Sequence, residues 1–329
     1  MTQSQQRRGV RGDVQQLVRF VRRLEKDLPQ EPLPPPLPPG RVIDVDNRGE
    51  MFVREQKGVA GGVTVVLVHG WALSADLNWF PGGYEVAARY GSVLAPDVRG
   101  HGRGLRSEKE FTLEAAADDI AALIRAVGAA PAVIVGYSMG GSLAMLCAAR
   151  HPDVVAGLVL AATGLQWRAT WWERVMWASM AVVEYGLRFG APKGLTARYL
   201  RSAVEQSPDL QRYQGWVKAE VRRGDPSDIG HAGKALANFD ARELARAIDV
   251  PTAVIVTCSD RLIRSDRQRE LAIATGASVI EVDGAHNAWL VRPREFASAI
   301  GQGLERVLPD AAGPRSGWVS GSRAVSPLV

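Results

Sequence analysis

Short apolar runs alternate with longer helical stretches from about residue 40 to residue 308. Continuous runs of Val, Ile and Leu, such as Val65–Val68, are typical of strands buried on both faces of a parallel sheet. Between the runs lie segments such as Leu113–Val127, which repeats its apolar residues at helical spacing, with Thr112 before it as a cap and Gly128 after it as a stop. The predicted strands are Arg41–Val45, Met51–Glu55, Thr64–Val68, Ser92–Ala95, Ala132–Val135, Gly157–Ala161, Thr252–Val256 and Ser278–Val282. This alternation predicts a doubly wound, mostly parallel, eight-stranded α/β sheet.

The alternation stops between residues 165 and 238, where tryptophans are frequent and strand-like runs are few. We interpret residues 165–238 as a helical cap inserted into a core made of residues 41–164 and 239–308. Residues 309–329 are rich in Ser, Gly and Pro, so we expect a flexible tail there.

The segment before the core has two parts. Residues 14–28 carry apolar residues at helical spacing with arginines between them, and a proline-rich run follows up to Gly40. Residues 1–40 are therefore predicted to form a basic amphipathic helix and a stiff linker. We favour a helix that packs on the protein or stays solvated, and contact of residues 1–28 with an anionic membrane surface is the alternative.

Composition narrows the class of protein. Hydrophobic residues make up 46% of the chain, which excludes wholesale disorder. The net charge is +5, which does not favour a nucleic-acid-binding protein. Cys147 and Cys258 each lie in an apolar run, so both are expected to be reduced core residues. We expect no metal and no organic cofactor. Since no signal peptide or long apolar span is visible, we expect a cytoplasmic location, with peripheral membrane contact left open.

The strongest chemical signal is the segment Gly136-Tyr137-Ser138-Met139-Gly140. A buried strand precedes this G-x-S-x-G pattern and a helix follows it. A turn this tight forces the serine into a strained conformation and projects its hydroxyl above the sheet, and the two glycines let strand and helix approach. We therefore predict that Ser138 is a nucleophile.

This setting resembles the nucleophile elbow of the α/β-hydrolase superfamily, in its serine esterase and lipase-like branch. The resemblance extends over roughly residues 40 to 309 and includes His69-Gly70-Trp71 and the loop Asp97-Val98-Arg99-Gly100-His101-Gly102. It implies an oxyanion hole made by the backbone N–H groups of Trp71 and Met139. It also implies that His69 and His101 brace loops rather than take part in the chemistry.

A serine at neutral pH needs a base, and the base needs an orienting carboxylate. The resemblance implies that His286, in the loop after the last strand, is the base, and that Asp260, after the preceding strand, is the acid. Thr257 stands where the family often has glycine. Asp266 and Asp283 are rival acids; we interpret Asp266 as a helix cap and Asp283 as a residue that shapes the loop.

The predicted activity is hydrolysis of a carboxylic ester with an apolar acyl group, through a Ser138–His286–Asp260 triad and an acyl-enzyme. Thioesterase, lactonase, carbon–carbon hydrolase and cofactor-free haloperoxidase chemistry share this triad and stay open. A second class, a non-catalytic module that binds a membrane or a protein, is disfavoured because every triad position is filled. Candidate substrate-binding residues are Trp171, Trp172 and Trp177 in the insertion.

Overall fold

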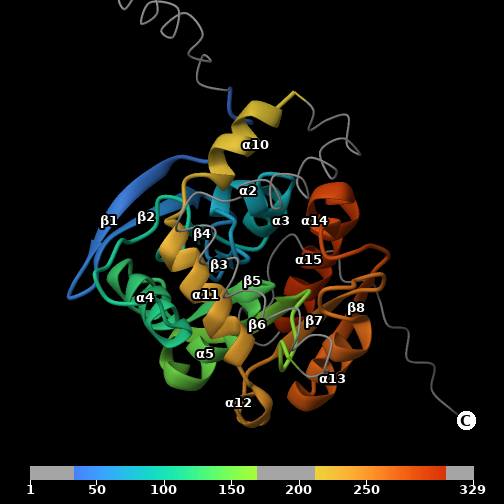
Figure 1. Ribbon diagram of the computed structural model, residues 1–329. Helices are drawn as coiled ribbons and strands as arrows, with labels where there is room; N and C mark the ends of the chain where they lie inside the picture. The colour runs from blue at the N-terminus through green and yellow to red at the C-terminus, as the bar shows by residue number, and fades with distance from the viewer. Residues whose placement is uncertain (1–32, 169–211, 309–329) are drawn as a thin grey trace, which may run out of the picture.

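The computed structural model describes residues 33–168 and 212–308 of the chain. Its centre is one eight-stranded sheet with the order β1-β2-β4-β3-β5-β6-β7-β8 (Figure 1). The strands are β1 (Gly40–Val45), β2 (Gly49–Gln56), β3 (Val65–Val68), β4 (Val93–Pro96), β5 (Ala132–Tyr137), β6 (Val155–Ala161), β7 (Thr252–Thr257) and β8 (Ser278–Val282). All eight predicted strands are present, and their bounds differ from the predicted ones by two residues at most.

The sheet is antiparallel at one edge and parallel elsewhere. β1 pairs with β2 and β2 with β4 in antiparallel fashion, while every pairing from β4 across to β8 is parallel. The parallel strands therefore end along one edge of the sheet, and loops that follow different strands meet there. This edge carries the candidate site.

Helices cover both faces of the sheet. The helices are α2 (Ala75–Trp79), α3 (Gly83–Ala88), α4 (Leu113–Ala126), α5 (Met139–Arg150), a 3₁₀ turn at Pro152–Val154, α10 (Gln214–Val221), α11 (Pro226–Asn238), α12 (Arg242–Arg246), α13 (Ser265–Thr275), α14 (Ala288–Val291) and α15 (Pro293–Val307). Thr112 caps α4 as predicted, because its side chain accepts a hydrogen bond from the Ala115 N–H.

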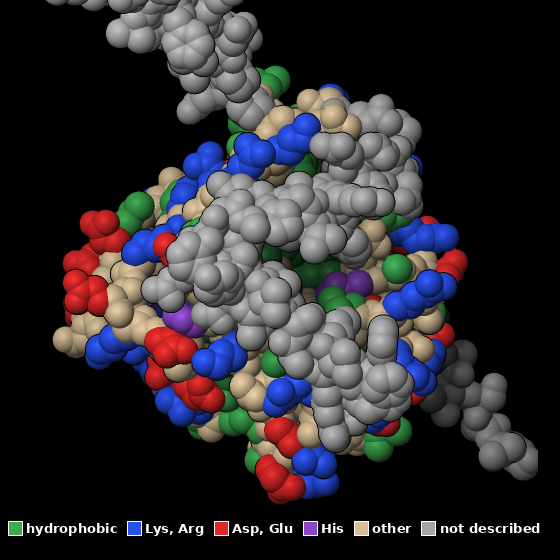
Figure 2. Space-filling view, viewed as in Figure 1, with side chains coloured by type: hydrophobic (Ala, Val, Ile, Leu, Met, Phe, Trp, Pro, Cys, Tyr) green, Lys and Arg blue, Asp and Glu red, His purple; other side chains and the backbone are tan. Residues whose placement is uncertain are grey.

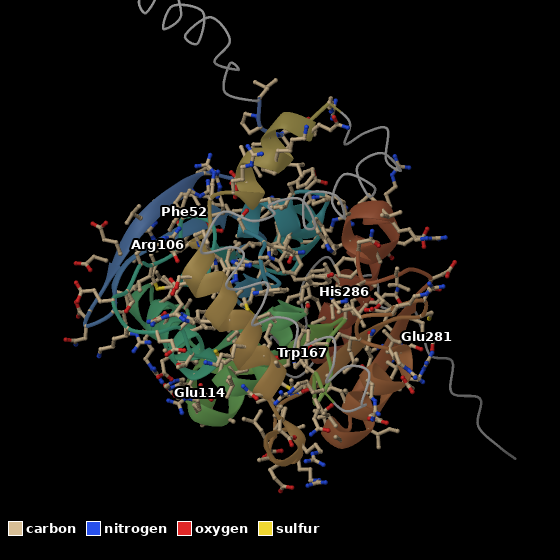
Figure 3. The ribbon with its side chains drawn as sticks, in the orientation of Figure 1. Phe52, Arg106, Glu114, Trp167, Glu281 and His286 are labelled. Atoms are coloured by element: carbon tan, nitrogen blue, oxygen red, sulfur yellow. The ribbon has the colours of Figure 1, made fainter. Side chains whose placement is uncertain are left out.

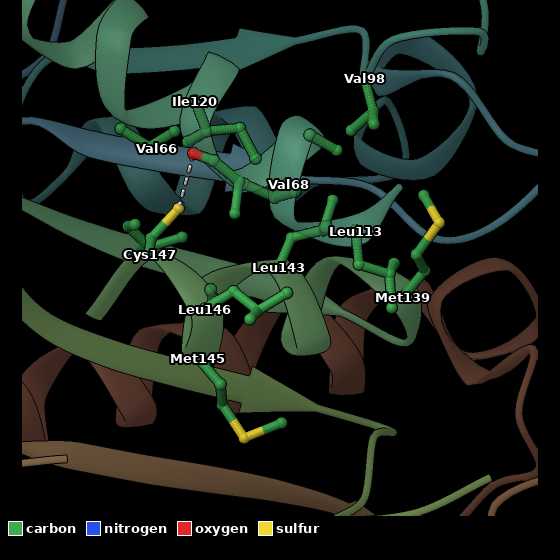
Figure 4. Packing of buried hydrophobic residues seen from close by; sticks show 14 of the residues in the cluster. Val66, Val68, Val98, Leu113, Ile120, Met139, Leu143, Met145, Leu146 and Cys147 are labelled. Atoms are coloured by element: carbon green, nitrogen blue, oxygen red, sulfur yellow. Dashed lines mark hydrogen bonds between the residues drawn. The ribbon is translucent and has the colours of Figure 1, made fainter. Parts of the chain in front are cut away.

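Successive residues of each parallel strand serve two different cores. In β3, Val66 and Val68 pack toward α4 and α5, whereas Val65 and Leu67 pack toward α3 and α15. Figure 4 shows the first core, where Leu143 and Leu146 of α5 lie among residues of β3 and α4. Burial on both faces explains why these strands have continuous apolar runs.

The structure describes residues 165–168 and 212–238 of the predicted insertion, and the helices lie in the second range. Residues 212–238 form α10 and α11, and Trp216 of α10 packs edge-on against Phe80, with ring centroids 5.1 Å apart. The candidate substrate residues Trp171, Trp172 and Trp177 lie outside the described residues, as do residues 1–32 and the tail from residue 309.

The two cysteines differ in burial. Cys147 is fully buried, and its thiol donates to the Ala117 carbonyl (Figure 4). Cys258 is only partly buried, so the prediction of a core position was wrong for it, because it follows the last residue of β7 and stands outside the sheet. In the ranges 33–168 and 212–308, no helix combines the length and the apolar character needed to span a bilayer.

Candidate active site

Ser138 lies in the turn between β5 and α5. Its φ is +54° and its ψ is −116°, a conformation that a residue with a side chain rarely adopts. The turn is held on both sides, since the Ser138 N–H donates to Ala161 and the Ser138 carbonyl accepts from the Gly141 N–H, both at 2.9 Å. The structure thus has the strained strand–turn–helix geometry that the sequence predicts.

Two glycines make this turn possible. A Cβ atom at Gly136 would lie 2.3 Å from the carbonyl oxygen of Gly140, and one at Gly140 would lie 2.1 Å from the carbonyl oxygen of Val68. Any side chain would therefore force the strand and the helix apart. The second contact also fixes the start of α5 against the end of β3.

His286 lies in the loop after β8 and Asp260 in the loop after β7, and together with Ser138 they form the candidate site. The Ser138 Oγ is 3.0 Å from Nε2 of His286, and Nδ1 of His286 is 2.8 Å from Oδ2 of Asp260. Because a buried carboxylate accepts, Nδ1 carries the ring proton and Nε2 is left to accept from the serine hydroxyl. The three side chains form one continuous hydrogen-bonded chain.

The histidine is the member of this chain nearest to solvent. Its side chain is 13% exposed, whereas that of Asp260 is fully buried. In Figure 2 a histidine shows near the middle of the face with hydrophobic side chains beside it, at the place where Figure 3 labels His286. A reactant can thus approach Ser138 and His286 while Asp260 stays shielded from water.

The carboxylate of Asp260 is held by its own loop. Its Oδ1 accepts from the backbone N–H groups of Leu262 and Ile263, at 2.8 and 3.0 Å. The two rival acids lie elsewhere: Asp266 pairs with Arg264, and Asp283, whose side chain is 76% exposed, pairs with Arg292. Asp266 does not cap α13, because the helix already begins at Ser265 and Asp266 lies in its first turn.

Tyr137, the residue before the nucleophile, holds the histidine loop. Its hydroxyl donates a short hydrogen bond to the backbone carbonyl of His286, and its ring packs on the imidazole with centroids 5.3 Å apart. The ring also packs edge-on against Trp289 and Phe296. The second position of G-x-S-x-G, Tyr137, therefore connects the elbow to the loop that carries His286.

The loop after β3 lies beside the elbow. Gly70 packs against the Tyr137 ring, which a Cβ atom would approach to 2.8 Å, and its N–H donates to Asn78 Oδ1 at 3.0 Å. Trp71 follows, and its indole N–H donates to the Ile229 carbonyl of α11 at 2.7 Å. Met139, directly after Ser138, is the first residue of α5 and is buried. Trp71 and Met139 thus come from the two segments that meet at Gly140.

Two buried histidines brace this region instead of joining the chain of Ser138. Nδ1 of His69 donates to the Gly70 carbonyl at 2.8 Å, and its Nε2 accepts from the Val98 N–H at 2.9 Å. Burial lowers the pKa of His69 to about 4 and, together with the nearby His69, lowers that of His101 to about 3. Both rings are neutral at pH 7. Because their pKa values are so low, neither ring readily takes up the proton that a catalytic base must accept.

A buried ion network supports the same loops. Asp76 accepts two hydrogen bonds from Arg54 and one from Arg103, and Asp97 accepts from Arg103 and from the Ala75 N–H. Burial alone would raise the pKa of Asp76, but the two arginines together hold it below its usual value. Arg99 pairs with Asp119 through both carboxylate oxygens. These charged groups are paired with one another and stabilise the loops that carry them.

The sequence did not predict the polar surroundings of Asp260. Thr257 and Gln268 are both fully buried, and each places a side-chain atom within 3.3 Å of Asp260 Oδ2. A signal was available, since Thr257 replaces a glycine typical of the resembled family and Gln268 is a polar residue on the buried face of α13. In the described ranges, no three His, Cys, Asp or Glu side chains are grouped so as to hold a metal ion.

The fold and this strand-end arrangement are those of an α/β hydrolase. A model of the Alpha/beta hydrolase family matches residues 65–299. The chain therefore belongs to the alpha/beta hydrolase family, which confirms the resemblance inferred from the sequence.

Relatives and solved structures agree with this placement. The chain is 30% identical over 253 residues to a pimeloyl-[acyl-carrier protein] methyl ester esterase of Neisseria meningitidis serogroup B, covering 74% of this chain and 94% of the relative. The structure of this chain is similar to that of a hydrolase from Pseudomonas aeruginosa PA01, with a TM-score of 0.68 and 20% sequence identity. The match covers 80% of this chain and 98% of the other. The structure is also similar to the enol-lactonase from Burkholderia xenovorans LB400, with a TM-score of 0.64, 25% identity and coverage of 80% and 100%.

Proposed function

We propose that this protein is a carboxylic-ester hydrolase in which Ser138, His286 and Asp260 act as nucleophile, base and acid. The observation that carries the proposal is the position of His286, whose two ring nitrogens lie 3.0 Å from Ser138 Oγ and 2.8 Å from Asp260 Oδ2. One imidazole can thus take the serine proton while the carboxylate holds its other nitrogen. The esterase relatives, about 30% identical over most of the chain, support ester hydrolysis.

The proton movements follow from this arrangement. Nε2 of His286 takes the hydroxyl proton as Ser138 Oγ attacks the acyl carbon, and Asp260 stabilises the resulting imidazolium. The oxyanion receives hydrogen bonds from the backbone N–H groups of Trp71 and Met139, which are fixed before the charge appears. The imidazolium returns its proton to the departing alkoxide, leaving an acyl-serine. Water then repeats the sequence: His286 accepts its proton, and the acid product leaves as Oγ is protonated again.

We further propose an apolar acyl group as the substrate and residues 165–238 as a cap that helps to bind it. Support comes from the hydrophobic side chains beside the histidine in Figure 2. It also comes from α11, which is bound to Trp71 at the site through the Ile229 carbonyl. The name of the Neisseria relative specifies a methyl ester of a pimeloyl group, which is also a carboxylic ester of an acyl compound.

A panel of p-nitrophenyl esters of increasing chain length tests the proposal. Turnover is expected to be highest for a medium or long acyl chain and to disappear in Ser138→Ala. Ser142→Ala is the matched control, because Ser142 is a buried serine of α5, four residues after Ser138, whose hydroxyl accepts from Trp167 instead of facing His286. Thioesters and lactones of the same acyl groups in the panel distinguish the related activities. Absence of turnover on every ester would contradict the proposal.

A further inference from the structure

A buried Thr–Gln pair lies behind the carboxylate of Asp260. Thr257 is the last residue of β7, and Gln268 lies on the inner face of α13 among apolar neighbours such as Leu271 and Ala272. Both side chains are fully buried. Burying an uncharged polar pair this deeply lowers the stability of the fold unless its hydrogen bonds are satisfied. The hydrogen-bond partners of the pair therefore indicate its role.

The protons in this pair can be counted. Gln268 Nε2 donates to the Ile263 carbonyl at 2.6 Å and to Thr257 Oγ1 at 2.9 Å, and Gln268 Oε1 accepts from the Thr257 N–H at 3.0 Å. The opposite amide orientation would place two oxygens 2.6 Å apart, so the assignment is fixed. The Thr257 hydroxyl thus accepts from Gln268, and its single proton points to the nearest remaining acceptor, Asp260 Oδ2 at 2.9 Å.

We propose that Thr257 and Gln268 are positioning residues that hold Asp260 Oδ2 toward His286. The inference rests on the proposed function. Oδ1 is already fixed by two backbone N–H groups, but Oδ2 otherwise meets only the imidazole, the partner that changes charge during the reaction. The Thr257 hydroxyl supplies a second anchor on Oδ2, and Gln268 fixes the direction of that hydroxyl because its amide bonds to the backbone at the end of β7 and at Ile263 in the following loop.

Neutral donors suit this task. An arginine or lysine here would hold the carboxylate but would oppose the positive charge that His286 acquires. A hydroxyl holds the oxygen and adds no net charge, so it weakens the attraction of Asp260 for the imidazolium far less than a cation would. A glycine at position 257 would have no side chain to do this, so the anchor depends on the threonine hydroxyl.

The central test compares Thr257→Val with Thr257→Ser. Valine has the shape of threonine without the hydroxyl, whereas serine keeps the hydroxyl and loses a methyl group. For Thr257→Val, kcat on a p-nitrophenyl ester is expected to fall about tenfold with KM nearly unchanged. The acidic limb of its kcat/KM profile is expected to move to higher pH, because a carboxylate with one hydrogen bond fewer holds the imidazolium more strongly. Thr257→Ser is expected to stay within about threefold of the wild type.

Gln268→Met tests the second residue without altering β7. Methionine keeps the length of the side chain and removes both polar atoms. The loss in kcat is expected to be smaller than in Thr257→Val. The double variant is expected to be slower than Thr257→Val by much less than Gln268→Met is slower than the wild type, since Gln268 Nε2 lies 3.3 Å from Asp260 Oδ2 but acts mainly through the hydroxyl that Thr257→Val removes. If the losses in kcat of the two single variants instead multiply in the double variant, the proposed coupling between Gln268 and Thr257 is overturned.

The controls separate this inference from the proposed function. If Ser138→Ala is inactive while Thr257→Val and Thr257→Ser have equal kinetics and pH profiles, the positioning role alone is overturned. Equal losses in both variants without a shift of the acidic limb would also overturn it, because they would indicate packing alone. Retained ester turnover in Ser138→Ala would overturn the proposed function and the positioning role together.

Discussion

Gly140 is where a single added methyl group has the largest predictable effect on the site. A Cβ atom there would lie 2.1 Å from the Val68 carbonyl oxygen and 2.9 Å from that of His69, distances that real Cβ atoms do not adopt. To reach even 3.0 Å, α5 and the end of β3 must move apart by about 1 Å, since both contacts are backbone and neither can rotate away.

The movement separates the two segments that the proposed mechanism needs together. α5 begins at Met139 next to the nucleophile, and β3 leads into the loop of Trp71. A misplacement of about 1 Å at a reacting centre costs roughly a hundredfold in rate, and overpacking costs about 1–3 kcal/mol in the free energy of unfolding. Gly140→Ala is therefore expected to lose about two orders of magnitude in kcat/KM while remaining folded.

The assay measures kcat/KM on the preferred ester and the free energy of unfolding in urea. Gly301→Ala in α15 is the matched control, because a Cβ atom there meets only side-chain atoms of Tyr90 and Val86, at 3.2 Å. It is expected to retain wild-type kcat/KM and to change stability by less than about 1 kcal/mol. A Gly140→Ala protein within threefold of the wild-type kcat/KM would refute the reasoning.

Three further predictions concern the surroundings of the site. Tyr137→Phe removes the hydroxyl that holds the His286 carbonyl, so kcat should fall about tenfold in ester turnover; an unchanged kcat would show that the loop is held by packing alone. Asp76→Ala leaves Arg54 and Arg103 without their shared carboxylate and should lower the free energy of unfolding in urea by about 3 kcal/mol, with Asp76→Asn less affected; equal stability of Asp76→Ala and the wild type would contradict the network. The third prediction concerns pH: because burial lowers the pKa of His101 from 6.5 to about 3, the unfolded state takes up the proton first as the pH falls. This contribution to stability is complete above about pH 6.5 and is lost as the pH falls toward 3, so the urea-unfolding free energy of His101→Gln should decline less steeply with falling pH than that of the wild type, and parallel curves would contradict it.

The strands and the elbow were predictable because each depends on local sequence. Val65–Val68 has the continuous apolar run of a strand buried on both faces, and the spacing of Gly136, Ser138 and Gly140 permits a tight turn between the strand and the helix that flank it in the sequence. His286 and Asp260 were chosen because of the resemblance to the α/β-hydrolase superfamily, and they lie together in the structure because loops after neighbouring parallel strands end at the same edge.

Contacts between distant segments could not be predicted. Whether Thr257 meets Gln268 depends on how α13 packs on β7, and whether Asp76 meets Arg54 depends on the placement of α2 beside β2. Charge and polarity are visible in the sequence, but pairing requires distances that only the packed structure sets. The error at Cys258 has the same origin, since the burial of the residue after β7 depends on which distant segments pack over it.

Labelling with a fluorophosphonate tests the central claim most directly, because the reagent reacts with a serine only when a neighbouring base activates it. Wild type, Ser138→Ala, His286→Ala and the control Ser142→Ala are compared, with the labelled peptide identified by mass spectrometry. The account predicts labelling of Ser138 in the wild type and in Ser142→Ala, none in Ser138→Ala and strongly reduced labelling in His286→Ala. Undiminished labelling of Ser138→Ala would contradict it.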